Sequence, residues 1–132
     1  MNQKPVAVGL LLCEQVIVEE KTRNVTPVNC FSRLMVERVP SEPVAFVLFA
    51  TLTDGLGEMS LGVTIERLDT LNRIYQRFLT MRFTDPLQEV RYILRVRNSS
   101  FPRFGAYQVC LLMDNELLAL KKFHVLAREN KP

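Results

Sequence analysis

The sequence predicts an all-β protein built as an antiparallel β-sandwich of about eight or nine strands. Several segments alternate apolar and polar residues with a period of two, which puts the apolar side chains on one face of a strand. Turn-forming residues separate these segments about every 8 to 12 residues, which is the spacing typical of a sandwich. At 132 residues the chain fits one domain, which we place at residues 1–132.

Composition and charge exclude several classes of protein. With 48% hydrophobic residues the chain has enough apolar side chains for an ordered core. A net charge of +3 is too small to argue for a nucleic-acid or membrane partner. Three cysteines without a Cys-x-x-Cys pair indicate neither a zinc site nor a disulfide framework, so we expect a reduced, cytoplasmic setting.

The first third of the chain is interpreted as strands joined by a charged loop. The apolar run at residues 6–13 is too short to span a membrane and has no cleavage signal, so we expect a first strand there. Residues 16–18 and 25–28 flank a charged loop and predict a hairpin. An extended segment over residues 29–39 then ends at two prolines, Pro40 and Pro43.

The middle of the chain contains the strongest turn signal. Residues 44–53 are followed by Asp54-Gly55-Leu56-Gly57, in which both glycines accept a positive φ at little cost. We therefore predict a hairpin that pairs residues 44–53 with residues 58–67. In the second arm every other residue is apolar, so one face is buried and the other is predicted to be solvated.

Residues 68–83 fit two interpretations. Apolar residues at helical spacing, with Asp69 or Thr70 as a cap, are compatible with a helix. A turn at residues 69–72 followed by a strand also fits, and it is favoured because the surrounding segments are all extended. The next strand, residues 90–97, is clearer because its apolar side chains alternate with Arg91, Arg95 and Arg97.

Residues 104–123 combine a Gly-x-Tyr step, an alternating strand, a turn at residues 114–116 and a returning strand. The pattern from Gly105 and Tyr107 through Val109 and Leu111 resembles the penultimate strand of immunoglobulin-like sandwiches. The resemblance implies a tyrosine corner, in which Tyr107 bonds back to the upstream backbone. Cys110 lies on the face opposite to Tyr107 and the chain has no Trp, so the antibody-type disulfide core is absent.

Three further motifs resemble those of an uncharacterised bacterial family of small proteins, a domain of unknown function. They are Leu11-Leu12-Cys13-Glu14, the segment from Phe49 to Gly55, and Phe101-Pro102 with Gly105-x-Tyr107 to Asp114. The resemblance implies a fold with an immunoglobulin-like sandwich and a single-domain extent. It implies no activity and no cofactor.

The most suggestive surface feature is a row of arginines. Arg91, Arg95 and Arg97 share one strand face, with Arg103 beyond, and guanidinium groups so placed can hold phosphates or an acidic partner. Arg73 and Arg77 would extend this row if their strand lies alongside. The alternative is a solvated face whose charges discourage edge pairing.

A second feature is the apolar face that residues 44–53 turn away from the core. Val47 and Phe49 lie on that face and require cover, either from another segment of the chain or from a second copy in a homodimer. We also assign structural roles to Gly55, Gly105 and Tyr107, at the turn and the corner described above.

Catalytic chemistry has little support in the sequence. His124 is the only histidine and has no metal-ligand or nucleophile spacing around it, and the carboxylates lie mostly at turns. We therefore predict a non-catalytic binding or scaffold module with a protein partner, without metal or cofactor. Two alternatives remain: a hydrolase with carboxylates as acid and base, and weak nucleic-acid binding along the arginines with Phe101 or Phe104 stacking on bases.

Overall fold

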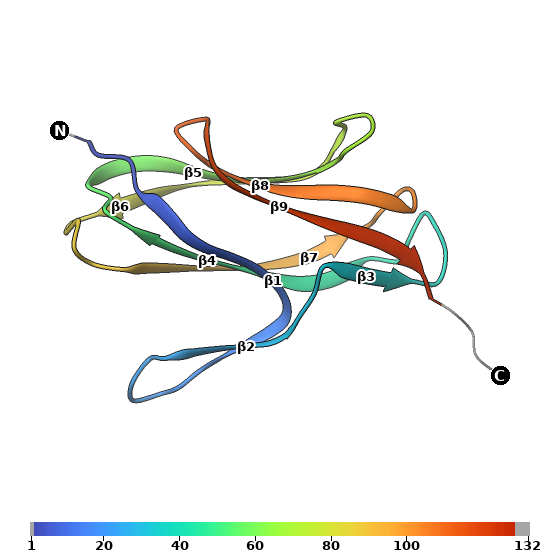
Figure 1. The fold of residues 1–132 in the computed structure, drawn as a ribbon, viewed down its shortest axis with the longest axis horizontal. Helices are drawn as coiled ribbons and strands as arrows, with labels where there is room; N and C mark the ends of the chain where they lie inside the picture. The colour runs from blue at the N-terminus through green and yellow to red at the C-terminus, as the bar shows by residue number, and fades with distance from the viewer. Residues whose placement is uncertain (1, 129–132) are drawn as a thin grey trace.

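The computed structural model describes residues 2–128, which form nine strands and no helix (Figure 1). The prediction of an all-β protein with eight or nine strands is confirmed. The strands are β1 (Val6–Val18), β2 (Val25–Cys30), β3 (Arg33–Val36), β4 (Val44–Thr53), β5 (Gly57–Arg67), β6 (Arg73–Phe83), β7 (Val90–Ser99), β8 (Gly105–Met113) and β9 (Glu116–Ala127). The single domain over 1–132 stays a prediction, and residues 1 and 129–132 lie outside the described part.

The strands form two sheets. One has four strands in the order β2-β1-β4-β7, and the other has five in the order β3-β9-β8-β5-β6. Neighbouring strands are antiparallel except β3, which joins β9 in parallel. Over residues 2–128 no helix is long and apolar enough to cross a membrane.

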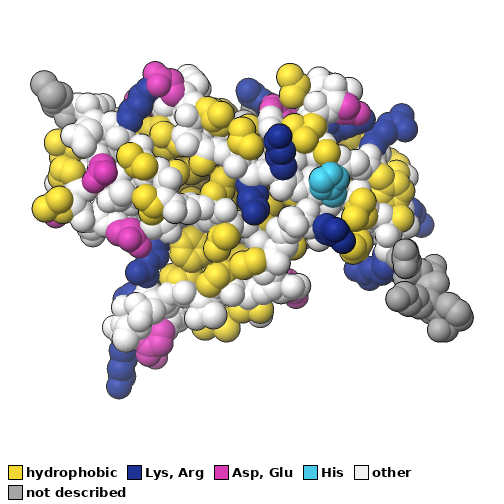
Figure 2. Space-filling model, in the orientation of Figure 1, with side chains coloured by type: hydrophobic (Ala, Val, Ile, Leu, Met, Phe, Trp, Pro, Cys, Tyr) yellow, Lys and Arg dark blue, Asp and Glu magenta, His cyan; other side chains and the backbone are white. Residues whose placement is uncertain are grey.

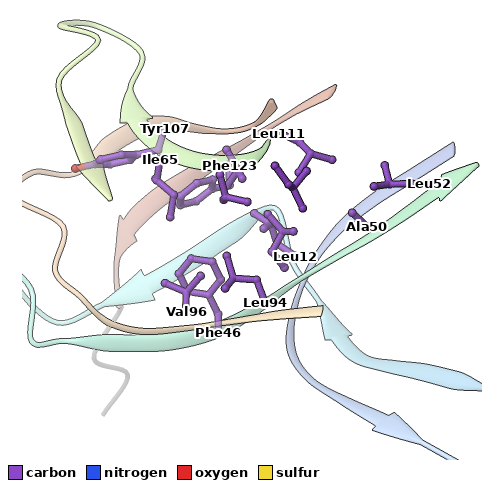
Figure 3. Packing of buried hydrophobic residues seen from close by; sticks show 14 of the residues in the cluster. Leu12, Phe46, Ala50, Leu52, Ile65, Leu94, Val96, Tyr107, Leu111 and Phe123 are labelled. Carbon is purple, nitrogen blue, oxygen red and sulfur yellow. The ribbon is translucent and has the colours of Figure 1, made fainter. Parts of the chain in front are cut away.

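A single core lies between the two sheets (Figure 3). Leu12, Phe46 and Leu94 of the four-stranded sheet point toward Ile65 and Phe123 of the five-stranded sheet, and all are buried. Aromatic rings gather at one end of this core, where Phe101, Tyr107 and Phe123 have centroids 5.2 to 5.9 Å apart. Each sheet therefore supplies the apolar face that the other needs to bury.

The predicted core face of β5 is confirmed. Met59, Leu61, Val63 and Ile65 are each at most 3% exposed. The opposite face is only partly solvated, because Gly62 and Thr64 are buried there. A Cβ added to Gly62 would lie 2.5 Å from the ring of Phe78, so the glycine makes room for that ring.

The predicted hairpin at Asp54 to Gly57 is wrong. β4 and β5 belong to different sheets, so the turn carries the chain from one sheet to the other. The two edges of β4 are already taken by β1 and β7, which leaves no place for β5. Positive φ values occur at Asp54 and Gly57 and not at Gly55, which instead packs against the buried ring of Phe83.

Residues 68–83 form a turn followed by the strand β6, which confirms the favoured interpretation over the helix. Leu71 takes a positive φ of 60° in this turn. β6 pairs with β5 along its whole length, so the pairing partner decides between two patterns that the local sequence left open.

Tyr107 makes the corner that the sequence predicts. Its hydroxyl donates to the carbonyl of Arg103 at 2.7 Å and accepts from the amide of Arg103 at 3.3 Å. Gly105 between them has a φ of 130°, a conformation that side chains rarely adopt. Burial raises the pKa of the Tyr107 phenol, so the hydroxyl remains a donor at neutral pH. The immunoglobulin-like type of the sandwich stays a prediction.

The substitution Tyr107→Phe tests the corner. It leaves the Arg103 carbonyl without its donor at the edge of the core, and we expect the free energy of unfolding to fall by about 1–3 kcal/mol. Urea denaturation with an unchanged m-value measures this loss. Tyr75→Phe is the matched control, with an expected change within about 0.5 kcal/mol. Equal losses in both variants would contradict the corner's role.

The substitution Gly55→Ala tests the packing of the turn. The new Cβ would lie 2.7 Å from the ring of Phe83, which is 3% exposed and has little room to move. We expect a loss of about 1–3 kcal/mol from overpacking. At Gly9 the nearest atoms to an added Cβ are 4.0 Å away, so Gly9→Ala should be close to neutral in the same denaturation experiment.

Candidate functional site

The hairpin of β1 and β2 extends below the four-stranded sheet, on the side away from β5, β8 and β9 (Figure 1). Arg91 of β7 donates a hydrogen bond to the carbonyl of Arg23, in the turn of this hairpin, at 2.7 Å. β2 and β7 are opposite edges of one sheet. The hairpin must therefore bend across the outer face of the sheet to bring Arg23 to Arg91.

The position of this hairpin is relevant to Val47 and Phe49, the residues predicted to form an oligomer face. Figure 2 shows hydrophobic side chains between the hairpin and the body of the protein. Val47 is 5% exposed in the single chain and Phe49 is half-buried, so the chain itself covers much of this face. Alternate residues of the hairpin are half-buried, namely Val16, Val18, Val25 and Pro27. The homodimer stays a prediction.

The candidate site is a cleft of about 400 Å³ that we call the arginine cleft. Its lining residues belong to β6 and β7, which are edge strands of the two different sheets. Tyr75 and Arg77 enter it from β6, while Ile93, Arg95 and Arg97 enter it from the outer face of β7. Its lining is completed by Leu94. Two predicted residues, Arg95 and Arg97, thus meet Arg77 from a strand of the other sheet.

The lining of the arginine cleft is positively charged. Its lining contains three arginines and no carboxylate. Among residues 2–128, none of these arginines forms an ion pair, whereas other surface cations do, as in Arg82 with Glu58 and Arg38 with Glu42. Three like charges close together repel one another, so an anion in the cleft would lower the electrostatic energy.

A tyrosine lies beside the cleft. Tyr92 points from β7 toward the interior, and burial raises the pKa of its phenol. The neighbouring Tyr75 raises that pKa further, while the guanidinium of Arg77 opposes the rise. The charge of Arg77 on β6 therefore influences the ionisation of Tyr92 on β7, a strand of the other sheet.

The other predicted arginines lie elsewhere. Arg91 binds the hairpin turn and lies 3.8 Å from Glu89, and the backbone of Arg103 belongs to the tyrosine corner. Arg73 donates to Gln76 and does not line the cleft. Tyr75 was not identified from the sequence. The sequence does contain one indication of it. Tyr75, Arg77, Leu79 and Met81 alternate along β6 on the side that faces the core, and Arg77 is the one charged residue among these four.

Catalytic groups do not gather at the arginine cleft. His124 is exposed on β9, and Figure 2 shows the histidine at the surface. No group of three metal-ligating side chains occurs within the described residues. Another cleft, of about 460 Å³, contains Glu37 and Glu42, but both are exposed and Glu42 is paired with Arg38. Both carboxylates therefore lie in water rather than in an apolar pocket of the kind that holds many carboxylic general acids.

Comparison with models of known protein families identifies the family of this chain. The model of a family of unknown function, DUF6941, matches residues 9–126. The chain belongs to this family. The match includes strands β2 to β8, most of β1 and β9, and the arginine cleft. The prediction of an uncharacterised family is confirmed. The DUF6941 description assigns no activity to its members. No curated protein matches the chain.

The substitution Arg77→Gln tests the electrostatic effect of Arg77 on the phenol of Tyr92. Removing the guanidinium should raise the pKa of Tyr92 further, because Arg77 lowers it in the native protein. The folded state holds this proton more tightly than the unfolded chain. The resulting stability is therefore present below the ordinary pKa of 10.0 and is lost as the pH rises through the folded pKa.

Ultraviolet absorbance during alkaline titration measures this pKa in the folded protein. Tyr92→Phe identifies which of the transitions belongs to Tyr92. Arg82→Gln removes an exposed arginine on the same strand but outside the cleft, and it should leave the transition in place. A Tyr92 transition that is the same in Arg77→Gln and in the native protein would contradict the electrostatic influence of Arg77 on Tyr92.

Proposed function

We propose that this protein is a non-catalytic binding module whose arginine cleft holds an acidic, extended segment of a partner protein. The observation that carries this proposal is the convergence of Arg77, Arg95 and Arg97 from two sheets without a carboxylate among the lining residues. Guanidinium groups form bidentate hydrogen bonds with carboxylates, so an acidic side chain gains both charge and directed bonds there.

The shape of the site supports an extended segment. β7 is the last strand of its sheet, so alternate backbone N–H and C=O groups along it point away from β4. A peptide can add to such an edge as a further strand. Its side chains would then alternate between the face of Arg95 and Arg97 and the side of Arg77. A peptide with carboxylates on both faces would thus meet all three arginines.

The same arginines discourage unspecific pairing. Charged side chains on an edge strand protect it from joining other strands, because a neutral or basic strand leaves the guanidinium groups unpaired. An acidic strand removes that penalty. The feature that prevents aggregation would therefore also select the partner.

Nucleic-acid binding has less support than an acidic protein. Phe101, one of the two aromatics expected to stack on bases, is fully buried and cannot reach a ligand. Phe104 is exposed but does not line the cleft. Three arginines in one small cleft also provide fewer phosphate contacts than most nucleic-acid-binding proteins make.

Two finer assignments belong to the same proposal. We assign the sandwich to the immunoglobulin-like type, which the bond from Tyr107 to Arg103 and the order of strands in the two sheets support. We place the protein in the cytoplasm, because its three cysteines are compatible with a reducing compartment.

Fluorescence anisotropy tests the binding function. The probe is a labelled peptide of about eight residues that repeats Glu-Glu-Val-Val, which places carboxylates on both faces of an extended segment and is long enough to follow the edge of β7. We expect Arg95→Glu with Arg97→Glu to weaken binding at least about tenfold, since two attractive contacts become repulsive. Arg33→Glu with Lys122→Glu is the matched control, because both residues are exposed and lie outside the cleft.

Three outcomes would each overturn a different part of the proposal. Equal weakening by the cleft variant and the charge-matched control would reduce the effect to net charge. A second peptide, N-methylated on alternate residues, keeps every carboxylate but loses backbone donors. If this peptide binds as well as the first, the acidic segment does not add as a strand. A phosphorylated oligonucleotide that outcompetes the peptide would favour nucleic acid.

A further inference from the structure

A pair of cysteines lies at the base of the β1–β2 hairpin. Cys13 and Cys30 are direct partners in the register of these antiparallel strands. Cys13 also pairs with Val47 of β4, so it is the last residue of β1 that belongs to the sheet before the hairpin continues alone. The two cysteines therefore lie at the point where the hairpin leaves the sheet.

The spacing of opposed residues in a sheet suits a disulfide. Directly opposite residues of antiparallel strands have Cα atoms about 4.5–5.5 Å apart, depending on the type of pair. Disulfides span Cα distances of about 4.4–6.8 Å. Both thiols are free in the structure. Burial raises the pKa of the Cys13 thiol, and the neighbouring Cys30 raises it further.

The two thiols differ in access. Cys13 is fully buried, whereas Cys30 is exposed. Cys30 lines a surface hollow of about 210 Å³ that also contains Lys121 and Phe31 but no carboxylate. A small anionic disulfide, such as oxidised glutathione, can therefore approach Cys30 beside a positive charge, while Cys13 is buried opposite Cys30.

We infer that Cys13 and Cys30 form a reversible thiol–disulfide site, which a small-molecule disulfide oxidises through Cys30. Cys30 loses its proton, and the thiolate attacks one sulfur of the small disulfide and releases one small thiol. Cys13 then loses its proton and attacks the sulfur of Cys30, which releases the second small thiol. Two protein thiols lose two electrons, and one small disulfide becomes two small thiols.

The bond would fix the hairpin to the sheet. Glu14 and Gln15 follow Cys13 directly and line a small cavity with Arg95 and Arg97. The turn of the hairpin is held by Arg91. A disulfide closes residues 13–30 into a loop and removes conformations in which the base of the hairpin opens. The oxidised protein would hold Glu14 in place beside two arginines of the cleft.

Thiol counting on the full chain tests the inference. The native protein is equilibrated with an excess of oxidised over reduced glutathione, quenched in acid, denatured, alkylated and weighed intact. We expect one alkylated cysteine, Cys110, in place of three, and a cross-link between the peptides of Cys13 and Cys30 after proteolysis. Reduction with dithiothreitol before alkylation should restore three. Three alkylated cysteines after oxidation, or a lasting glutathione adduct on Cys30, would overturn it.

Two variants check the route. Cys13→Ser should accumulate a glutathione adduct at Cys30, because the resolving thiol is absent. Cys110→Ser should still lose both remaining thiols on oxidation, because Cys110 lies in the other sheet. An adduct on Cys110 alone in Cys13→Ser would rule out entry through Cys30.

Hydrogen exchange of the backbone amides in residues 14–29 should slow on oxidation, because the disulfide restricts opening of the hairpin. Unchanged exchange would rule out the fixing of the hairpin.

Discussion

The pairing of β4 on both edges is the constraint on which the rest of this structure depends. β1 occupies one edge and β7 the other. The chain therefore cannot return as a neighbour of β4 after Gly55, and it crosses to the second sheet instead. That crossing makes β5 the partner of β6 and β8 and makes β7 the last strand of its own sheet. The position of the arginine cleft follows from this one choice of partners.

The opposed faces of the two sheets supply the stability for that arrangement. The core is continuous from Leu52 at one end to the stacked rings of Tyr107 and Phe123 at the other. Buried apolar area is the main favourable term in folding, and both sheets contribute to it. Tyr107 adds a polar bond at the margin of the core, where its hydroxyl reaches the backbone of Arg103. The loop before β8 is thus fixed to the core by one side chain.

The arginines of the protein have different interaction partners in different parts of the structure. Arg91 secures the hairpin turn, Arg82 pairs with Glu58, and Arg67 pairs with Asp69. Arg77, Arg95 and Arg97 instead line one cleft without a carboxylate among its lining residues. Formal charge and residue type are the same in each case. Only the neighbours distinguish a structural arginine from one that is available to a ligand.

The sequence by itself determined the strands, because alternation of apolar and polar residues is a local property. It located β4, β7 and β8 closely, placed the core face of β5, and identified Tyr107 as a corner residue. It also selected Arg95 and Arg97. It could not decide strand pairing, since an Asp-Gly turn reverses the chain without specifying whether the next strand joins the same sheet or the facing one.

The tertiary structure decided everything that depends on segments distant in sequence. It brought Arg77 into one cleft with Arg95, joined the hairpin turn to Arg91, and set Cys13 opposite Cys30. It also separated Arg91 from Arg95, although both lie on one strand face. Such contacts depend on how two sheets stack and how a hairpin bends, and these are properties of packed surfaces rather than of any local pattern of residues.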